Sequence, residues 1–228
     1  EDMLSFLPPK TIPDSITLPA TMSLKGLVKG GAKSAYVNVA LTTSLGDATI
    51  DGTIANMADT DAASYSAAIV LQGLQVGRII QQPETVGKVT ASFTLKGNGY
   101  DPQKAAADID GVFQSVEYNQ YTYRNIRLDG AMAHQKFTAK GGMRDPNLHF
   151  AFEAKGNIGS AHPGFVITAN IDSIKTAPLH LTTDAIIYRG NIVANFPEFH
   201  LDSLNGQLLV TNSLLVANNQ RISLDSVE

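Results

Sequence analysis

An alternation of apolar and polar residues governs the stretch between Gly87 and Gly156. In Gly87–Lys96, four apolar residues alternate with Lys, Ser and Thr, and Leu148–Lys155 repeats the arrangement. A period of two is typical of a strand with one face in an apolar environment and the other in water. The stretch is therefore predicted to form amphipathic β-strands.

The same alternation continues over most of the chain, which divides into roughly fourteen short strand-like runs separated by turn residues. No βαβ rhythm is present, which favours antiparallel pairing. Leu74–Gln82 alone has a partly helical spacing, and Pro83 is expected to end that helix. We predict an all-β fold: an elongated, curled and groove-like antiparallel sheet with an apolar concave interior and at most one short helix.

The domain organisation follows from the prolines and the strand-like runs. Residues 1–20 carry four of the ten prolines and are expected to form an extended lead-in, because proline cannot donate to a sheet ladder. Residues 21–228 are expected to form one elongated β-groove domain, with 21–83 and 87–228 as possible sub-repeats. Near the C-terminus, Leu179–Thr183, Ala185–Tyr188 and Asn191–Ala194 are predicted to be separate strands.

A short unit of apolar, polar, Gly, any residue and apolar recurs five times. Its glycines are Gly26, Gly52, Gly111, Gly130 and Gly206. One interpretation is that the Asp-Gly and Asn-Gly pairs mark hairpin turns. The alternation continues in register through each glycine, however, which favours glycines inside strands on the apolar side, where they permit a crease in the sheet.

Charge and composition exclude several classes of protein. The net charge of −4 gives no basic footprint for nucleic acid, so we expect no nucleic-acid partner. The chain has no cysteine, which excludes disulfides and thiolate metal sites. The longest apolar run, Ala67–Leu71, is too short to cross a bilayer. The chain starts without methionine, and we expect it to be a segment of a longer protein.

The sequence offers no pattern typical of an active site. The five histidines, His134, His149, His162, His180 and His200, lack metal-ligand spacing, and Asp108 and Asp110 lie on the polar side of a regular strand. No GxSxG, SxxK or phosphate-binding glycine loop is present. We therefore expect neither an enzyme nor a cofactor. Tyr118, Tyr121 and Tyr123 cluster at one hairpin, where cross-strand pairing is favoured over sugar stacking.

Several motifs together resemble a known family. They include Leu95-Lys96-Gly97-Asn98-Gly99, Ile109-Asp110-Gly111, Asn125-Ile126-Arg127-Leu128-Asp129-Gly130 and Met143-Arg144-Asp145-Pro146-Asn147-Leu148. These runs are similar to the repeating middle of AsmA-like envelope proteins, and within them most similar to the TamB branch. The likeness covers most of the chain and consists of strand-and-glycine patterns.

The resemblance implies a very large protein of double-membrane bacteria that is anchored in the inner membrane and crosses the periplasm. Such proteins consist of long sheets folded like a taco, whose hydrophobic groove is thought to carry phospholipid between the membranes. An outer-membrane partner of the Omp85 class is implied for parts outside this segment. We expect the N-terminal anchor and the most C-terminal portion of the family pattern to lie outside this segment.

Two main hypotheses follow. In the first, a groove binds phospholipid acyl chains and is lined by Val89, Phe93, Leu95, Ile109, Phe113, Leu128, Met132, Phe137, Leu148, Phe150, Phe152, Phe165, Ile167 and Ile171. In the second, open sheet edges recruit another β-protein during outer-membrane protein assembly. A sugar-binding β-sandwich adhesin is a third reading. The same apolar pattern would also fill a closed, dry core, so the sequence leaves open whether the interior is a groove.

Overall fold

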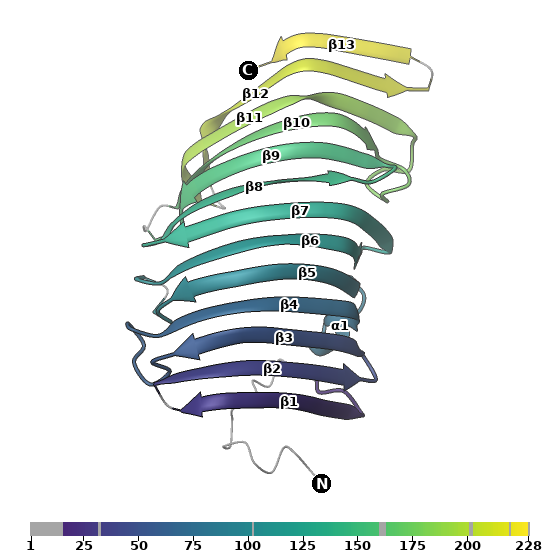
Figure 1. The fold of residues 1–228 in the computed structure, drawn as a ribbon. Helices are drawn as coiled ribbons and strands as arrows, with labels where there is room; N and C mark the ends of the chain where they lie inside the picture. The colour runs from purple at the N-terminus through teal and green to yellow at the C-terminus, as the bar shows by residue number, and fades with distance from the viewer. Residues whose placement is uncertain are drawn as a thin grey trace.

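A computed structural model describes residues 16–31, 33–101, 103–159, 163–200, 203–218 and 220–227. Within these residues the chain forms thirteen strands and one helix of a single turn (Figure 1). Most of the predicted lead-in, residues 1–15, lies outside the described part, and residues 16–19 have no regular structure.

The elements follow one another without a crossover. They are β1 (Met22–Gly31), β2 (Ser34–Thr43), β3 (Gly46–Ala55), β4 (Ser64–Gln75), α1 (Val76–Ile79), β5 (Val86–Asn98), β6 (Ala106–Tyr118), β7 (Tyr121–Ala133), β8 (Lys136–Arg144), β9 (Leu148–Asn157), β10 (Gly164–Lys175), β11 (Ile186–His200), β12 (Ser203–Ala217) and β13 (Gln220–Val227). Each strand pairs antiparallel with its neighbours in sequence, so the whole is one thirteen-stranded meander.

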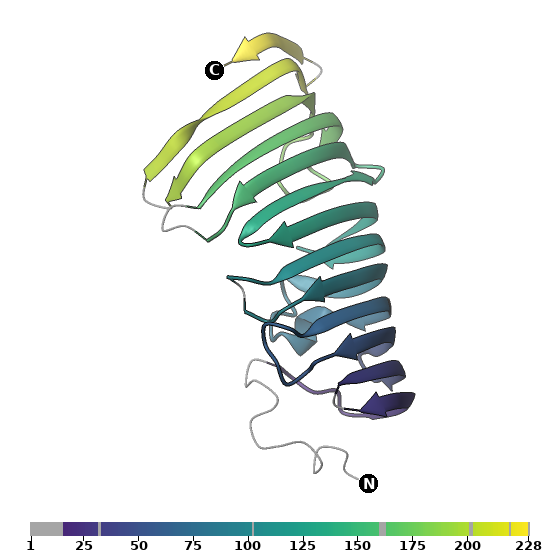
Figure 2. The ribbon, with the colours of Figure 1, turned by 60° about the vertical axis from the view of Figure 1, so that its left-hand side comes forward.

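The strands arch in a common direction, and β1 and β13 lie at opposite ends of the stack (Figures 1 and 2). The sheet is open: it is neither closed nor strongly curled. The predictions of an all-β fold, antiparallel pairing and at most one short helix are confirmed. β4 and β5, which lie on either side of the boundary between the two proposed sub-repeats, pair directly, with a register shift between Leu71 and Leu74.

Three local predictions near the C-terminus are wrong. Leu179–Thr183 is a loop, because Leu179 is buried at the end of the sheet and successive turn hydrogen bonds return to Thr176. The two runs that follow it belong to one strand, β11. Register shifts beside Gly190 and Pro197 absorb the residues that interrupt the alternation, as β-bulges do.

The predicted helix is confirmed but covers only Val76–Ile79. Among the hairpins, β2 and β3 flank a tight turn at Leu45, and Tyr118 pairs directly with Tyr121 across the turn at Asn119.

Candidate functional site

The register of the sheet gathers its apolar residues into continuous cross-strand rows. The central row crosses all thirteen strands at Gly26, Val39, Ile50, Ile69, Phe93, Gly111, Leu128, Gly141, Phe152, Ala169, Ile192, Val210 and Val227. Every position is apolar or glycine. We call the side of the sheet that carries this row the apolar face and the opposite side the polar face.

Three parallel rows extend the apolar face on either side of the central row. The first is Leu24, Leu41, Ala48, Leu71, Ala91, Phe113, Ile126, Met143, Phe150, Ile171 and Gly190. The second is Val28, Val37, Gly52, Ala67, Leu95, Ile109, Gly130, Ala139, Ala154, Ile167, Ala194 and Leu208. The third is Gly30, Ala35, Ile54, Tyr65, Gly97, Ala107, Met132, Phe137, Gly156, Phe165 and Phe196. Tyr65 is the one residue in the four rows with a polar side-chain group, so the face is a broad hydrocarbon surface.

All fourteen predicted groove residues lie on the apolar face. Twelve of them belong to the four rows, and Val89 and Leu148 belong to the same face nearer the α1 end of the strands. The prediction left out residues of other strands, such as Leu24, Ile69 and Ile192, and also Ile126 and Met143 on strands that it covered in part. The alternation of all these residues is visible in the sequence.

The five repeated glycines also lie inside strands on the apolar face, so the hairpin-turn interpretation is wrong for them. They let neighbouring strands approach closely. A Cβ added at Gly111 would lie 2.3 Å from the Cβ of Phe93, and one at Gly206 would lie 2.4 Å from the ring of Phe196. Glycine thus makes room for the large side chain on the adjacent strand.

Alanine exposure shows which face is the more enclosed. When the terminal residues of the strands are set aside, no alanine of the apolar face is exposed, whereas Ala40, Ala68, Ala131 and Ala151 of the polar face all are. Because alanine has the same size everywhere, this difference indicates that the strands bend toward the apolar face. The helix α1 lies within this bend (Figure 2).

The apolar face is nevertheless left uncovered by any second layer in the described part of the chain. Contacts between elements join sequential strands, and α1 to β5. Among all described residues only eight apolar residues are buried, four of them alanines, and Leu179 is the one large side chain that is fully buried. Most side chains of the four rows are half-exposed, and Val28 and Leu208 are 66% and 52% exposed. A filled core of the usual kind would bury them.

Buried packing occurs at both edges of the sheet: Ala63 and Ala105 are buried at one edge, and α1, the turn at Asn119 and the loop 176–185 lie at the other. Leu179 from that loop is 1% exposed, and His180 Nδ1 lies 3.2 Å from the carbonyl oxygen of Asn119. This loop therefore braces the strand ends from β10 to β6. It closes one margin of the apolar face and leaves its breadth open.

Asp145 organises the same edge. The residue is 5% exposed, and its carboxylate accepts hydrogen bonds from the Tyr121 hydroxyl, from the backbone N–H of Arg124 at 3.2 Å and from that of Asn147 at 2.9 Å. Burial, and then the bond to this carboxylate, raise the pKa of Tyr121. The carboxylate is fully partnered, so it serves the β8–β9 turn and is not poised for acid–base chemistry.

The polar face carries charges that pair across the strands. Arg127 lies 3.9 Å from Asp110 and Lys140 lies 3.7 Å from Asp129, all well exposed. Asp110, one of the two neighbouring aspartates noted in the sequence, thus belongs to a row of solvated ion pairs.

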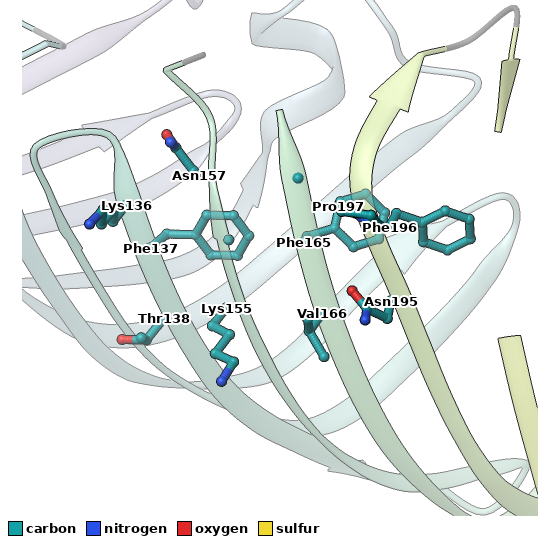
Figure 3. A pocket seen from close by; sticks show the side chains of 12 residues that line it. Lys136, Phe137, Thr138, Lys155, Asn157, Phe165, Val166, Asn195, Phe196 and Pro197 are labelled. Atoms are coloured by element: carbon teal, nitrogen blue, oxygen red, sulfur yellow. The ribbon is translucent and has the colours of Figure 1, made fainter. Parts of the chain in front are cut away.

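A shallow hollow of about 620 Å³ lies over β8–β11 (Figure 3). It is lined by two polar-face rows, which begin at Lys136 and Thr138, and by the apolar-face row of Phe137 between them. Phe137 points away from Lys136 and Thr138 in this view.

The described residues hold no cluster of His, Asp or Glu that could bind a metal ion. His162 lies outside them. No helix among them is long and apolar enough to span a membrane. Comparison with protein-family models, with curated proteins and with solved structures found no match to this chain. The most extensive feature of the described residues is the apolar face.

Proposed function

We propose that the apolar face binds the acyl chains of phospholipid and that the chain is a segment of an envelope-spanning protein which carries phospholipid between the inner and outer membranes. One observation carries this proposal: four cross-strand rows are apolar almost throughout, and no second layer in the described part of the chain covers them. In this proposal the sheet curls further around the bound acyl chains to form a groove, and it bends along the line of the repeated glycines.

The energetics of lipid transfer suit such a surface. A diacyl lipid exposes about thirty methylenes, and at about 0.8 kcal/mol each its passage through water costs on the order of 20 kcal/mol or more. A continuous apolar face lowers this barrier by contact alone. The proposed activity needs no catalytic group and no cofactor, so we propose a carrier and not an enzyme.

The location follows from the family resemblance. The TamB-like motifs support a place in the periplasm, with the inner-membrane anchor and any contact to an Omp85-class protein in parts outside this segment. The polar face, with its exposed ion pairs, suits the aqueous side of such a groove.

Adjacent residues of β6 provide a matched test. Phe113 lies on the apolar face, whereas Val112 lies on the polar face, is 39% exposed and pairs with Arg127. We expect the purified protein to retain phospholipid in native mass spectrometry, Phe113→Asp to lose it while remaining folded, and Val112→Asp to retain it. A lipid-free wild-type protein, or equal occupancy in the two variants, would refute the proposal.

Strand addition is the second candidate function. The observation that favours it is that β1 and β13 each pair on one side only in the described sheet, which leaves backbone donors and acceptors available to another chain. Disulfide crosslinking of a client strand to a cysteine placed at Lys25 of β1, in protein that carries no lipid, would favour this function over lipid transfer.

A further inference from the structure

Two hydroxyl groups meet on the apolar face, between β11 and β12. Tyr188 Oη lies 3.1 Å from Ser213 Oγ. Ser213 is 6% exposed and Tyr188 is half-buried. Gly190 makes room for the pair, because a Cβ there would lie 2.5 Å from Tyr188 Oη and 2.8 Å from Ser213 Oγ. The tyrosine ring thus lies back over the glycine and brings its hydroxyl to the serine.

The pair holds one more donor than it uses. Each hydroxyl carries one O–H group, and the only hydrogen bond that either side chain makes among the described residues is the one they share. One O–H therefore has no partner among the described residues. Ser213 is the more buried of the two, so its O–H is best satisfied by donating to Tyr188 Oη. The O–H of Tyr188, on the more exposed side chain, is then free to donate into the space over the apolar face.

Binding of an acyl chain would remove the hydrogen-bond acceptor of the Tyr188 O–H. On the empty face, water accepts the hydrogen bond. A hydrocarbon chain that displaces this water offers no acceptor, and an unsatisfied donor in an apolar environment is costly. A diacyl phospholipid supplies an acceptor at a fixed place, the ester carbonyl oxygen where each chain joins the glycerol.

We propose that the Tyr188–Ser213 pair is a hydrogen-bonding site for the ester carbonyl of a bound diacyl lipid, with Tyr188 as the donor and Ser213 as the residue that positions it. The proposal rests on the proposed function and adds the class of lipid to it. It gives the face a preference for ester-linked chains over ether-linked chains of the same length, since an ether-linked lipid lacks the carbonyl oxygen.

The test compares two phosphatidylethanolamines that differ only in ester or ether linkage of the same two chains. The full chain is mixed with equal amounts of both, and the bound ratio is read by native mass spectrometry. One net hydrogen bond corresponds to a preference of about five-fold for the ester lipid. Tyr188→Phe is expected to bring the ratio close to one, and Ser213→Ala to lower it.

Tyr36→Phe is the matched control. Tyr36 lies on the polar face, where its hydroxyl donates to Asp51 at 2.9 Å, so its loss removes a hydrogen bond without touching the apolar face. The wild-type preference is expected to persist in this variant. Equal binding of both lipids by the wild-type protein would overturn the assignment of the hydroxyl pair and leave the lipid-binding function standing. Binding of neither lipid would overturn both.

Discussion

Replacing Gly111 by alanine tests whether the repeated glycines are required by the close approach of neighbouring strands. A Cβ at this position would lie 2.3 Å from Phe93 Cβ and 3.0 Å from Phe93 Cα. Neither atom is the flexible end of a side chain, so β5 and β6 must separate locally to admit the methyl group. Overpacking of this kind costs about 1–3 kcal/mol.

An opposing effect reduces the net change. Alanine restricts the unfolded chain more than glycine does and stabilises a compatible site by about 0.4–1 kcal/mol. We therefore expect Gly111→Ala to lower the free energy of unfolding by about 1–2 kcal/mol. At Gly130 the nearest atom is the Cγ2 methyl of Ile109 at 3.2 Å, which can move, and at Gly31 nothing lies within 4 Å. Gly130→Ala should be close to neutral, and Gly31→Ala neutral or slightly stabilising.

Urea unfolding followed by circular dichroism measures the three variants against the wild-type protein. From the most to the least stable, the expected order is Gly31→Ala, Gly130→Ala and Gly111→Ala. A Gly111→Ala protein as stable as Gly130→Ala would show that the strands are not held at the close distance on which the account of the glycines depends.

Three further predictions concern stability. Leu179→Ala should cost about 2–5 kcal/mol because the side chain is 1% exposed, whereas Leu181→Ala, two residues away and 61% exposed, should change stability by no more than about 0.5 kcal/mol in the same urea assay. Burial raises the pKa of Tyr121, so the unfolded chain loses the Tyr121 proton at a lower pH than the folded protein does. The free energy of unfolding should therefore fall as the pH rises above about 10. Tyr121→Phe should lessen this fall in unfolding curves measured up to about pH 11. Lys140→Ala should cost less than about 1 kcal/mol, because the ion pair with Asp129 is exposed, and the difference should shrink in high salt.

Much of the architecture could be predicted because a single-layer sheet imposes one rule on every strand. Residues two apart share a face, so Phe150 and Phe152 could be assigned to the same side before any pairing was known. The exceptions are places where that rule does not operate. Leu179 lies in a loop and is buried against the end of the sheet. The residues that follow it alternate between polar and apolar without forming a strand, so the pattern there wrongly predicts one.

The hydroxyl pair could not be predicted for a different reason. Tyr188 and Ser213 lie on different strands, and the register between them depends on a bulge beside Gly190. A shift of one residue would place Ser213 on the polar face. The uncovered state of the apolar face was likewise beyond the sequence, because the same alternation would serve a closed sandwich. It depends on the absence of a second layer among the described residues, which only the structure shows.

Crosslinking to a photoactivatable phospholipid tests most directly whether the apolar face is a lipid-accessible surface. The chain has no cysteine, so single cysteines can be placed along β9 one at a time, each as the residue to which the photoactivated lipid crosslinks. Lipid crosslinks are expected at Phe150, Phe152 and Ala154 and not at Ala151 or Glu153, a period of two that follows the apolar face. Crosslinking at both sets of positions, or at neither, would contradict the account.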